Sequence, residues 1–183
     1  MDSEVVVSAF QDDSLGSDDA IVIAEKIKKG ELDAKTVTRD AIKRAELVNP
    51  KLNAITEENF DFAQANSEKT FSGFFQGVPT FIKDTDEVPG LPLYLGSRSL
   101  PGEPSEKFSK AAKQIIDTGL NCLGTTTTPE FGLTGTTESL RFGATCNPWN
   151  PAYSTGGSSG GSSALVAAGA VSYTHLTLPT RRF

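Results

Sequence analysis

Hydrophobic positions recur at helical spacing in the first third of the chain. In residues 20–29 and 34–48, apolar side chains return every three or four positions, and acidic residues stand just before each run. This spacing predicts two amphipathic helices, the second of which should end before Pro50. A short strand is expected over residues 52–56 and a third helical segment over residues 57–69.

The middle of the chain contains two short runs of mainly apolar and β-branched residues, which is typical of buried strands. They cover residues 78–84 and 120–123, and a helical pattern over 108–118 separates them. The alternation of helices and strands predicts an α/β fold with a parallel or mixed sheet. Lys83 would then lie at the C-terminal end of a core strand, at the sheet edge where α/β proteins build their sites.

Two other stretches show neither helical nor strand periodicity. Residues 86–104 are rich in Pro, Gly, Leu and Ser, and they predict a long loop of the kind that often carries function. Residues 135–155 are expected to form an ordered connector pinned by Trp149. Between the two, Pro129 is expected to open a short helical turn.

A run of glycines and hydroxyl residues at 153–163 leads directly into the small, uncharged run 164–171. One interpretation is a flexible linker, because Gly and Ser are common linker residues. The other is a glycine-rich turn that caps a buried helix, with Ser162 or Ser163 at the N-cap. The apolar run that follows favours the turn, whose backbone N–H groups would be donors for an anion or an oxyanion.

Composition narrows the classes of function. The 183 residues are 37% apolar and 22% charged, with a net charge of -6 and no cluster of Lys and Arg. A folded domain with a small-molecule site fits these values, whereas nucleic acid and membranes are not expected as partners. The acidic N-terminus and the absence of a long apolar run predict a soluble, cytoplasmic protein. Cys122 and Cys146 are expected to be free thiols, and neither a metal nor a cofactor is predicted.

Lys83 and the Gly/Ser turn together suggest a serine hydroxyl that a neutral lysine activates. A lysine can act as a base only if its surroundings lower its pKa toward neutral pH. A Ser-His-Asp triad is disfavoured, because the only histidine is His175 near the end of the chain. A phosphate-binding loop is disfavoured as well, since serine stands where that motif needs lysine.

Several short motifs resemble those of the amidase signature family in order and spacing. They are Gly77-Val78-Pro79, Ile82-Lys83-Asp84, Leu123-Gly124-Thr125, Pro129-Glu130-Phe131, Cys146-Asn147-Pro148-Trp149 and residues 156–162. The resemblance covers residues 15–171 and implies an α/β/α fold with a mixed central sheet and N-terminal helices, incomplete in this chain. It also implies hydrolysis of a carboxylic amide to an acid and ammonia or an amine, by a Ser-Ser-Lys triad and an acyl-enzyme, without a cofactor.

The resemblance assigns roles to particular residues. It makes Lys83 the base and Ser158 the serine that carries a proton between the base and the nucleophile. It also implies a cis peptide bond between Gly157 and Ser158. Asp84 is expected to orient the strand end rather than to react. The residues expected to support the site or bind substrate are Thr155, Gly156, Gly157 and Ser159.

The nucleophile of the family lies in a further Gly-Gly-Ser motif, about two dozen residues after the middle serine, and no such motif follows residue 162 here. Residues 1–171 are therefore expected to be the N-terminal part of a single amidase domain. Residues 172–183 do not resemble the family and are expected to be a non-native tail. The chain by itself is expected to be inactive.

Two alternatives to a stand-alone amidase remain open. One is the A subunit of glutamyl-tRNA(Gln) amidotransferase, a branch of the same family, although residues 129–132 (Pro-Glu-Phe-Gly) favour the stand-alone enzyme. The other is a catalytically dead homologue that only binds. A small-molecule amide is the expected partner, and the resemblance allows a homodimer of the full-length protein.

Overall fold

A mixed three-stranded sheet organises the computed structural model, which describes residues 6–172. The strand order is β1 (Ile55–Glu58), β3 (Asn121–Thr126), β2 (Pro79–Lys83). β1 runs antiparallel to β3, and β2 runs parallel to it. The mixed sheet predicted from the sequence is thus confirmed. The tail predicted for residues 172–183 lies, apart from Ser172, outside the described residues.

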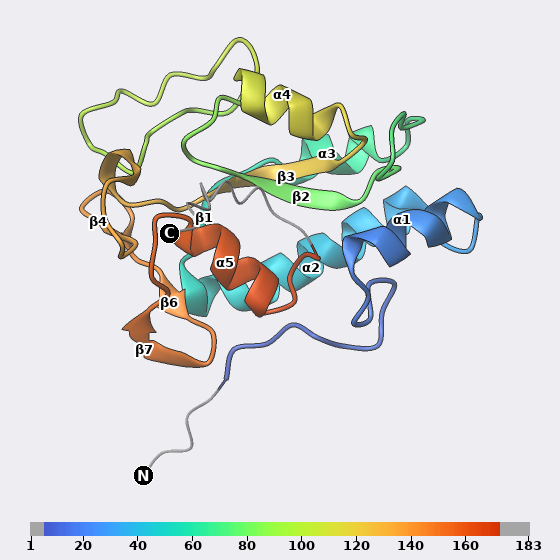
Figure 1. Cartoon of the computed structure of the whole chain (residues 1–183), viewed down its shortest axis with the longest axis horizontal. Helices are drawn as coiled ribbons and strands as arrows, with labels where there is room; N and C mark the ends of the chain where they lie inside the picture. The colour runs from blue at the N-terminus through green and yellow to red at the C-terminus, as the bar shows by residue number, and fades with distance from the viewer. Residues whose placement is uncertain (1–5, 173–183) are drawn as a thin grey trace, which may run out of the picture.

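Helices cover both faces of this sheet (Figure 1). α2 (Ala34–Leu52) and α5 (Gly160–Ala167) lie on one face together with α1 (Ala20–Lys28), and α4 (Lys110–Ile116) lies on the other. Successive residues of β2 serve the two faces, because side chains alternate along a strand. Phe81 belongs to the core formed with α2 and α5, and Ile82 packs with Ala112 of α4. The arrangement confirms the predicted α/β class.

Several predicted boundaries are wrong by a few residues. Pro50 does not stop α2, which continues to Leu52 and ends at Asn53 in the left-handed conformation. The extra turn is stabilised because Leu52 is fully buried, and because the Asn49 side chain accepts hydrogen bonds from the N–H groups of Ala54 and Ile55. Tertiary contacts here outweigh the preference of proline for a helix end.

Other elements are displaced or shortened. The first strand forms at Ile55–Glu58 instead of 52–56, and α3 occupies only Phe60–Asn66 of the predicted 57–69. α4 is likewise shorter than predicted, because Ser109 caps it: its hydroxyl accepts the N–H of Ala112. β3 is longer than predicted and includes Gly124 and the first two of the four consecutive threonines at 125–128.

The connector 135–155 is ordered, as predicted, but Trp149 does not pin it. Its side chain is 62% exposed. The segment instead forms two small antiparallel hairpins, and the Thr145 hydroxyl donates to the Asn53 carbonyl at 2.8 Å. The short elements are η1 (Glu130–Gly132), β4 (Glu138–Ser139), β5 (Gly143–Ala144), β6 (Cys146–Asn147) and β7 (Asn150–Ser154).

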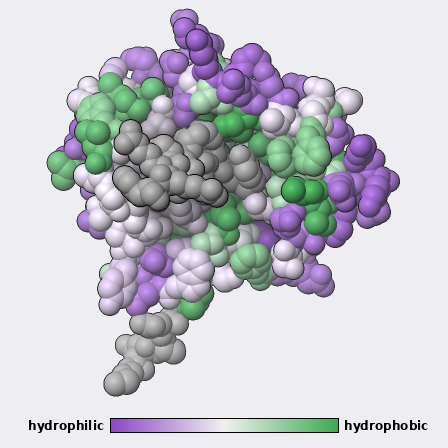
Figure 2. Space-filling model, in the orientation of Figure 1, coloured by the Kyte–Doolittle hydropathy of each residue, from purple (hydrophilic) through white to green (hydrophobic). Residues whose placement is uncertain are grey.

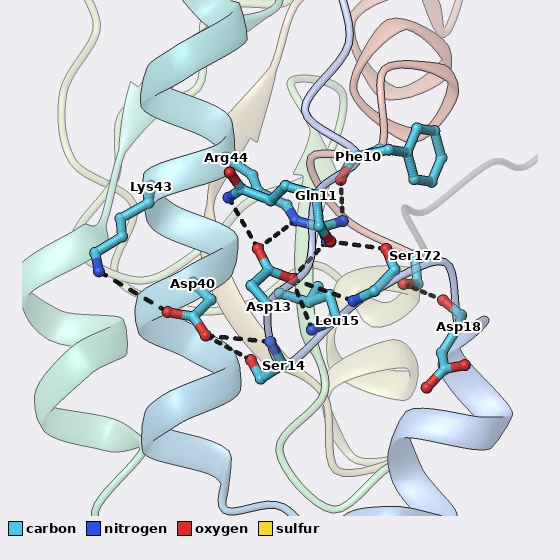
Figure 3. Close-up of polar contacts among 12 residues, drawn as sticks. Phe10, Gln11, Asp13, Ser14, Leu15, Asp18, Asp40, Lys43, Arg44 and Ser172 are labelled. Atoms are coloured by element: carbon cyan, nitrogen blue, oxygen red, sulfur yellow. Dashed lines mark hydrogen bonds and ion pairs between the residues drawn. The ribbon is translucent and has the colours of Figure 1, made fainter.

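A buried arginine ties the N-terminal segment to the two helices beneath the sheet (Figure 3). Arg44 of α2 has a side chain only 2% exposed and forms an ion pair with Asp13. Its Nη1 donates to the Gly169 carbonyl at 2.8 Å, just beyond the end of α5. Since every described contact of its guanidinium is to a carboxylate or a carbonyl, Arg44 fixes the far end of α5 relative to α2.

The surface mixes polar and apolar residues. Hydrophilic residues dominate the top and right of the view in Figure 2, and hydrophobic residues appear among them in separate patches. Within residues 6–172, the most exposed large hydrophobic side chains are Leu133, Leu140 and Tyr153, all in the segment that leads to the Gly/Ser turn. None of the helices in this described part is long and apolar enough to cross a membrane.

Candidate active site

Lys83 and Ser158 meet at the C-terminal edge of β2. Lys83 is the last residue of the strand, is 6% exposed, and pairs in register with Thr126 of β3. Its Nζ lies 2.8 Å from Ser158 Oγ and donates a hydrogen bond to it. The sheet edge and the Gly/Ser turn thus come together as the sequence suggested, although the two residues are 75 positions apart in the chain.

The surroundings of Lys83 favour its neutral form. Burial lowers the pKa of the Lys83 amine below its ordinary value of 10.5, and the negative charge of Asp86 offsets part of that effect. An ammonium group can only donate hydrogen bonds, whereas a neutral amine has a lone pair that can accept one. On losing its proton, Lys83 could therefore accept the proton of the Ser158 hydroxyl at the same distance.

The turn before α5 contains a cis peptide bond between Gly157 and Ser158, as the resemblance implied. Ser158 itself is half-buried. The Gly156 carbonyl accepts a hydrogen bond from Thr137 and the Ser158 carbonyl accepts one from Thr128. The sequence showed Thr128 only as one of four consecutive threonines, a signal too general to assign it a contact.

The N-cap prediction for α5 is wrong. Ser159 occupies the N-cap position, and Ser162 and Ser163 lie within the first turn of the helix. The helix begins at least three residues earlier than predicted, at Gly160, because Gly160 and Gly161 leave room for neighbouring chain segments. A Cβ atom on Gly160 would collide with the Thr137 side chain, and one on Gly161 would collide with the Ala54 carbonyl oxygen. The linker interpretation is excluded, since the turn is packed and ordered.

The remaining predicted site residues lie around the same turn. Thr155 Oγ1 donates weakly to the Gly160 carbonyl at 3.4 Å, and its N–H donates to the Thr145 carbonyl. Ser159 is 5% exposed, and its Oγ has no hydrogen-bond partner among the described residues. Ser162, which the sequence considered only as a cap, pairs its hydroxyl with that of Thr126 at 2.7 Å. The four predicted supporting residues therefore belong to the same turn as Ser158, but none of them makes a described side-chain hydrogen bond to Ser158.

Asp84 is fully buried and holds the loop that follows β2. Its two carboxylate oxygens accept the N–H groups of Tyr94 and Gly96, each at 2.9 Å. Burial raises the pKa of the Asp84 carboxyl to about 6, although these backbone N–H groups lower it. The contacts agree with the expectation that Asp84 orients the strand end, since its carboxylate does not reach Ser158 through any described hydrogen bond.

No metal site is evident in the described part of the chain: nowhere in residues 6–172 do three or more His, Cys, Asp or Glu side chains gather closely enough to hold an ion. Cys122 and Cys146 are free thiols, as predicted. His175 lies outside the described residues. The contact between Lys83 and Ser158 offers proton transfer between a hydroxyl and a buried amine.

Comparisons with known proteins agree with the fold and with the motif positions. The amidase family model matches residues 36–175. AmiC of Mycobacterium tuberculosis (strain ATCC 25618 / H37Rv), which carries the name of an amidase, is 43% identical over 171 residues that cover 92% of this chain and 36% of that protein. The A subunit of the glutamyl-tRNA(Gln) amidotransferase from Synechococcus sp. (strain CC9605) is 35% identical over 79% of this chain and 31% of its own length.

Among solved structures, 6-aminohexanoate cyclic dimer hydrolase superimposes with a TM-score of 0.79 at 36% identity, over 84% of this chain and 32% of that one. The chain belongs to the amidase family. It spans about a third of the length of the curated relatives it matches.

Proposed function

We propose that the protein hydrolyses a carboxylic amide through an acyl-enzyme, with Lys83 as the base and Ser158 as the proton relay. The observation that carries this proposal is the 2.8 Å contact between Lys83 Nζ and Ser158 Oγ. A hydroxyl cannot lose its proton at neutral pH unless a base of matched pKa accepts it. Lys83 supplies that base because its burial disfavours the charged amine.

The relay moves one proton at a time. As the nucleophilic serine attacks the amide carbon, its proton passes to Ser158 Oγ, and the proton of Ser158 passes to Lys83 Nζ. When the carbon–nitrogen bond breaks, the same path returns a proton to the leaving nitrogen, which departs as ammonia or an amine. Water then attacks the ester by the same route and releases the acid.

The nucleophile belongs, in this proposal, to native sequence that would follow residue 171. We propose that residues 1–171 are the N-terminal part of a single amidase domain and that 172–183 are a non-native tail. Thr155, Gly156, Gly157 and Ser159 would support the turn or contact substrate. The cytoplasmic location and the homodimer of the full-length protein stay predictions.

The test uses the full-length protein, meaning an enzyme of the length of its amidase relatives that begins with residues 1–171 of this chain. Lys83→Ala and Ser158→Ala should each lower kcat/KM for simple amides by about 10²–10⁴-fold. Lys35→Ala, which changes an exposed lysine paired with Glu68, serves as the matched control and should keep full activity. Wild-type kcat/KM should rise with pH until the Lys83 amine is neutral. Full activity of Lys83→Ala would overturn the proposal.

A role within an amidotransferase complex is the second candidate, supported by the 35% identity to a component of such an enzyme. The two functions differ in what they need for turnover. A stand-alone amidase releases ammonia from an amide without other protein chains or tRNA, whereas the amidotransferase component should depend on them. Ammonia release by the isolated full-length protein would therefore exclude the second candidate, and the Pro-Glu-Phe-Gly run at 129–132 favours that result.

A further inference from the structure

The hydroxyls of two buried threonines donate hydrogen bonds to the backbone on either side of the Gly157–Ser158 peptide bond. Thr137 Oγ1 donates to the Gly156 carbonyl at 2.7 Å. Thr128 Oγ1 donates to the Ser158 carbonyl at 2.9 Å. Their side chains come from different segments, and both residues are almost fully buried, at 1% and 0% exposure. Neither hydroxyl contacts Lys83 Nζ or Ser158 Oγ in any described hydrogen bond, so neither is in a position to react.

The two bonds fix the direction in which Ser158 points. The position of a Cβ atom follows from the backbone atoms around its Cα, so a held backbone leaves only the χ1 rotation free. Turning Ser158 Oγ away from Lys83 by a movement of the backbone would require at least one of the two carbonyls to lose a buried donor. Both hydrogen bonds lie in a partly buried environment, where a carbonyl left without a donor costs free energy, so such a movement is unfavourable.

The parallel strands β2 and β3 position both Lys83 and Thr128. Lys83 ends β2, and the Asp84 N–H donates to the Thr126 carbonyl. This hydrogen bond keeps the segments that follow β2 and β3 side by side beyond the sheet. Thr128 follows two residues later on the β3 side. The sheet therefore delivers the amine from one strand and the donor that holds the Ser158 backbone from its parallel neighbour.

A second segment, which ends in Thr137, also lies directly against the turn. A Cβ atom on Gly157 would lie 3.1 Å from the Thr134 carbonyl oxygen and from the Thr136 carbonyl carbon. This close approach places the Thr137 hydroxyl within reach of the Gly156 carbonyl. Two chain segments therefore hold the turn, and each contributes one threonine donor, Thr128 from one and Thr137 from the other.

We propose that Thr128 and Thr137 are positioning residues that keep Ser158 Oγ aligned with Lys83 during proton transfer. The inference rests on the proposed function, because it assigns these hydroxyls an effect on catalysis through Ser158. Thr127 provides a matched comparison. It is equally buried, at 1% exposure, but the described hydrogen bonds of its hydroxyl go to the Ala54 carbonyl and the Thr145 hydroxyl. Thr127 packs against Gly161, but its hydroxyl makes no described hydrogen bond to the Gly156 or Ser158 carbonyl.

The test compares Thr128→Val, Thr137→Val and the control Thr127→Val in the full-length protein, each made with and without Ser158→Ala. Valine keeps the shape of threonine and replaces the hydroxyl with a methyl group, which cannot donate a hydrogen bond. Thr128→Val should lower kcat by about 10- to 100-fold with KM changed less than about threefold, since a misplaced reacting group slows the chemical step. Thr128→Ser, which restores the donor, should recover most of the activity. Thr127→Val should stay within about threefold of the wild type.

The variants made on Ser158→Ala separate positioning from general damage to the structure. If Thr128 acts through Ser158, its substitution should cause almost no further loss once that hydroxyl is gone. An equal loss with and without Ser158→Ala would overturn the inference, and so would a Thr128→Val enzyme as active as Thr127→Val. If Thr128→Val fails to fold, Thr137→Val allows the same comparison, because Thr137 donates to the Gly156 carbonyl on the other side of the peptide bond.

The same set of proteins distinguishes failure of the inference from failure of the proposed function. If Ser158→Ala is as active as the wild type, the relay itself is wrong and the positioning role falls with it. If Ser158→Ala is inactive while both valine variants keep full activity, the relay stands and only the positioning role is overturned.

Discussion

Lys83 Nζ and Ser158 Oγ lie 2.8 Å apart although 75 positions separate them in the chain. The contact joins the end of a core strand to the turn before α5, and its geometry depends on how rigidly each side is held. The sheet holds the lysine, α5 carries the turn, and Arg44 anchors the opposite end of that helix. Each of these supports leads to a measurable expectation.

Lys83→Met should keep or raise the stability of the protein at neutral pH. The Lys83 pKa is lowered in the folded state, so the folded protein gains stability as pH rises through that lowered pKa toward 10.5, and this contribution is absent below the lowered pKa. Methionine removes the buried charge while filling the space. Urea unfolding at neutral pH should give a free energy at or above the wild type, and the advantage should shrink as pH rises toward 10.5. Phe81→Ala on the same strand, which leaves a cavity, should lose about 3–5 kcal/mol.

Asp84→Asn should change how stability depends on pH. The Asp84 pKa is raised to about 6 from 3.8, so its contribution is fully present below pH 3.8 and is lost as pH rises through 6. The loss amounts to about 3 kcal/mol at most. The difference in unfolding free energy between wild type and variant should therefore vary between about pH 3.8 and about pH 6. A constant difference over that range would contradict the assignment, and exposed Asp117→Asn should follow the wild type throughout.

Arg44→Met should destabilise the protein by about 3–5 kcal/mol, because it leaves the Asp13 carboxylate and the Gly169 carbonyl without their buried donor. Although burial raises it, hydrogen bonds from Arg44 and neighbouring groups hold the pKa of Asp13 below 3.8. That part of the stability is lost as pH falls through the lowered pKa. Chemical unfolding measures both effects. Lys35→Met removes an exposed ion pair with Glu68 and should cause no measurable change.

Gly161→Ala should destabilise the protein even though alanine is the better helix former. An added Cβ would collide with the Ala54 carbonyl oxygen and would lie 2.5 Å from the Thr127 nitrogen. Overpacking of this kind costs about 1–3 kcal/mol. Gly135→Ala is the matched control, because a Cβ there meets nothing within 4 Å. Thermal unfolding of the two variants should differ clearly; equal melting temperatures would show that α5 can move away from β3.

The sequence by itself determined the order and type of most elements. The helical spacing of residues 20–48, the two uninterrupted strand runs and the long loop all follow from side-chain pattern and local turn residues, and the structure confirms them within a few positions. The pattern also placed Lys83 at a strand end, because the apolar run stops there. The family motifs directed attention to Ser158, and the cis bond before it is present.

Only the tertiary structure decided the remaining features. Pro50 stays inside α2 because Leu52 is buried against other elements. α5 begins at Gly160 because neighbouring segments of the chain approach too closely for any residue larger than glycine. The same reason separates Thr128 from Thr127: adjacent and chemically identical in the sequence, they differ because only one reaches the Ser158 carbonyl. A hydrogen bond between distant segments depends on where the fold places two atoms, and no local pattern records that distance.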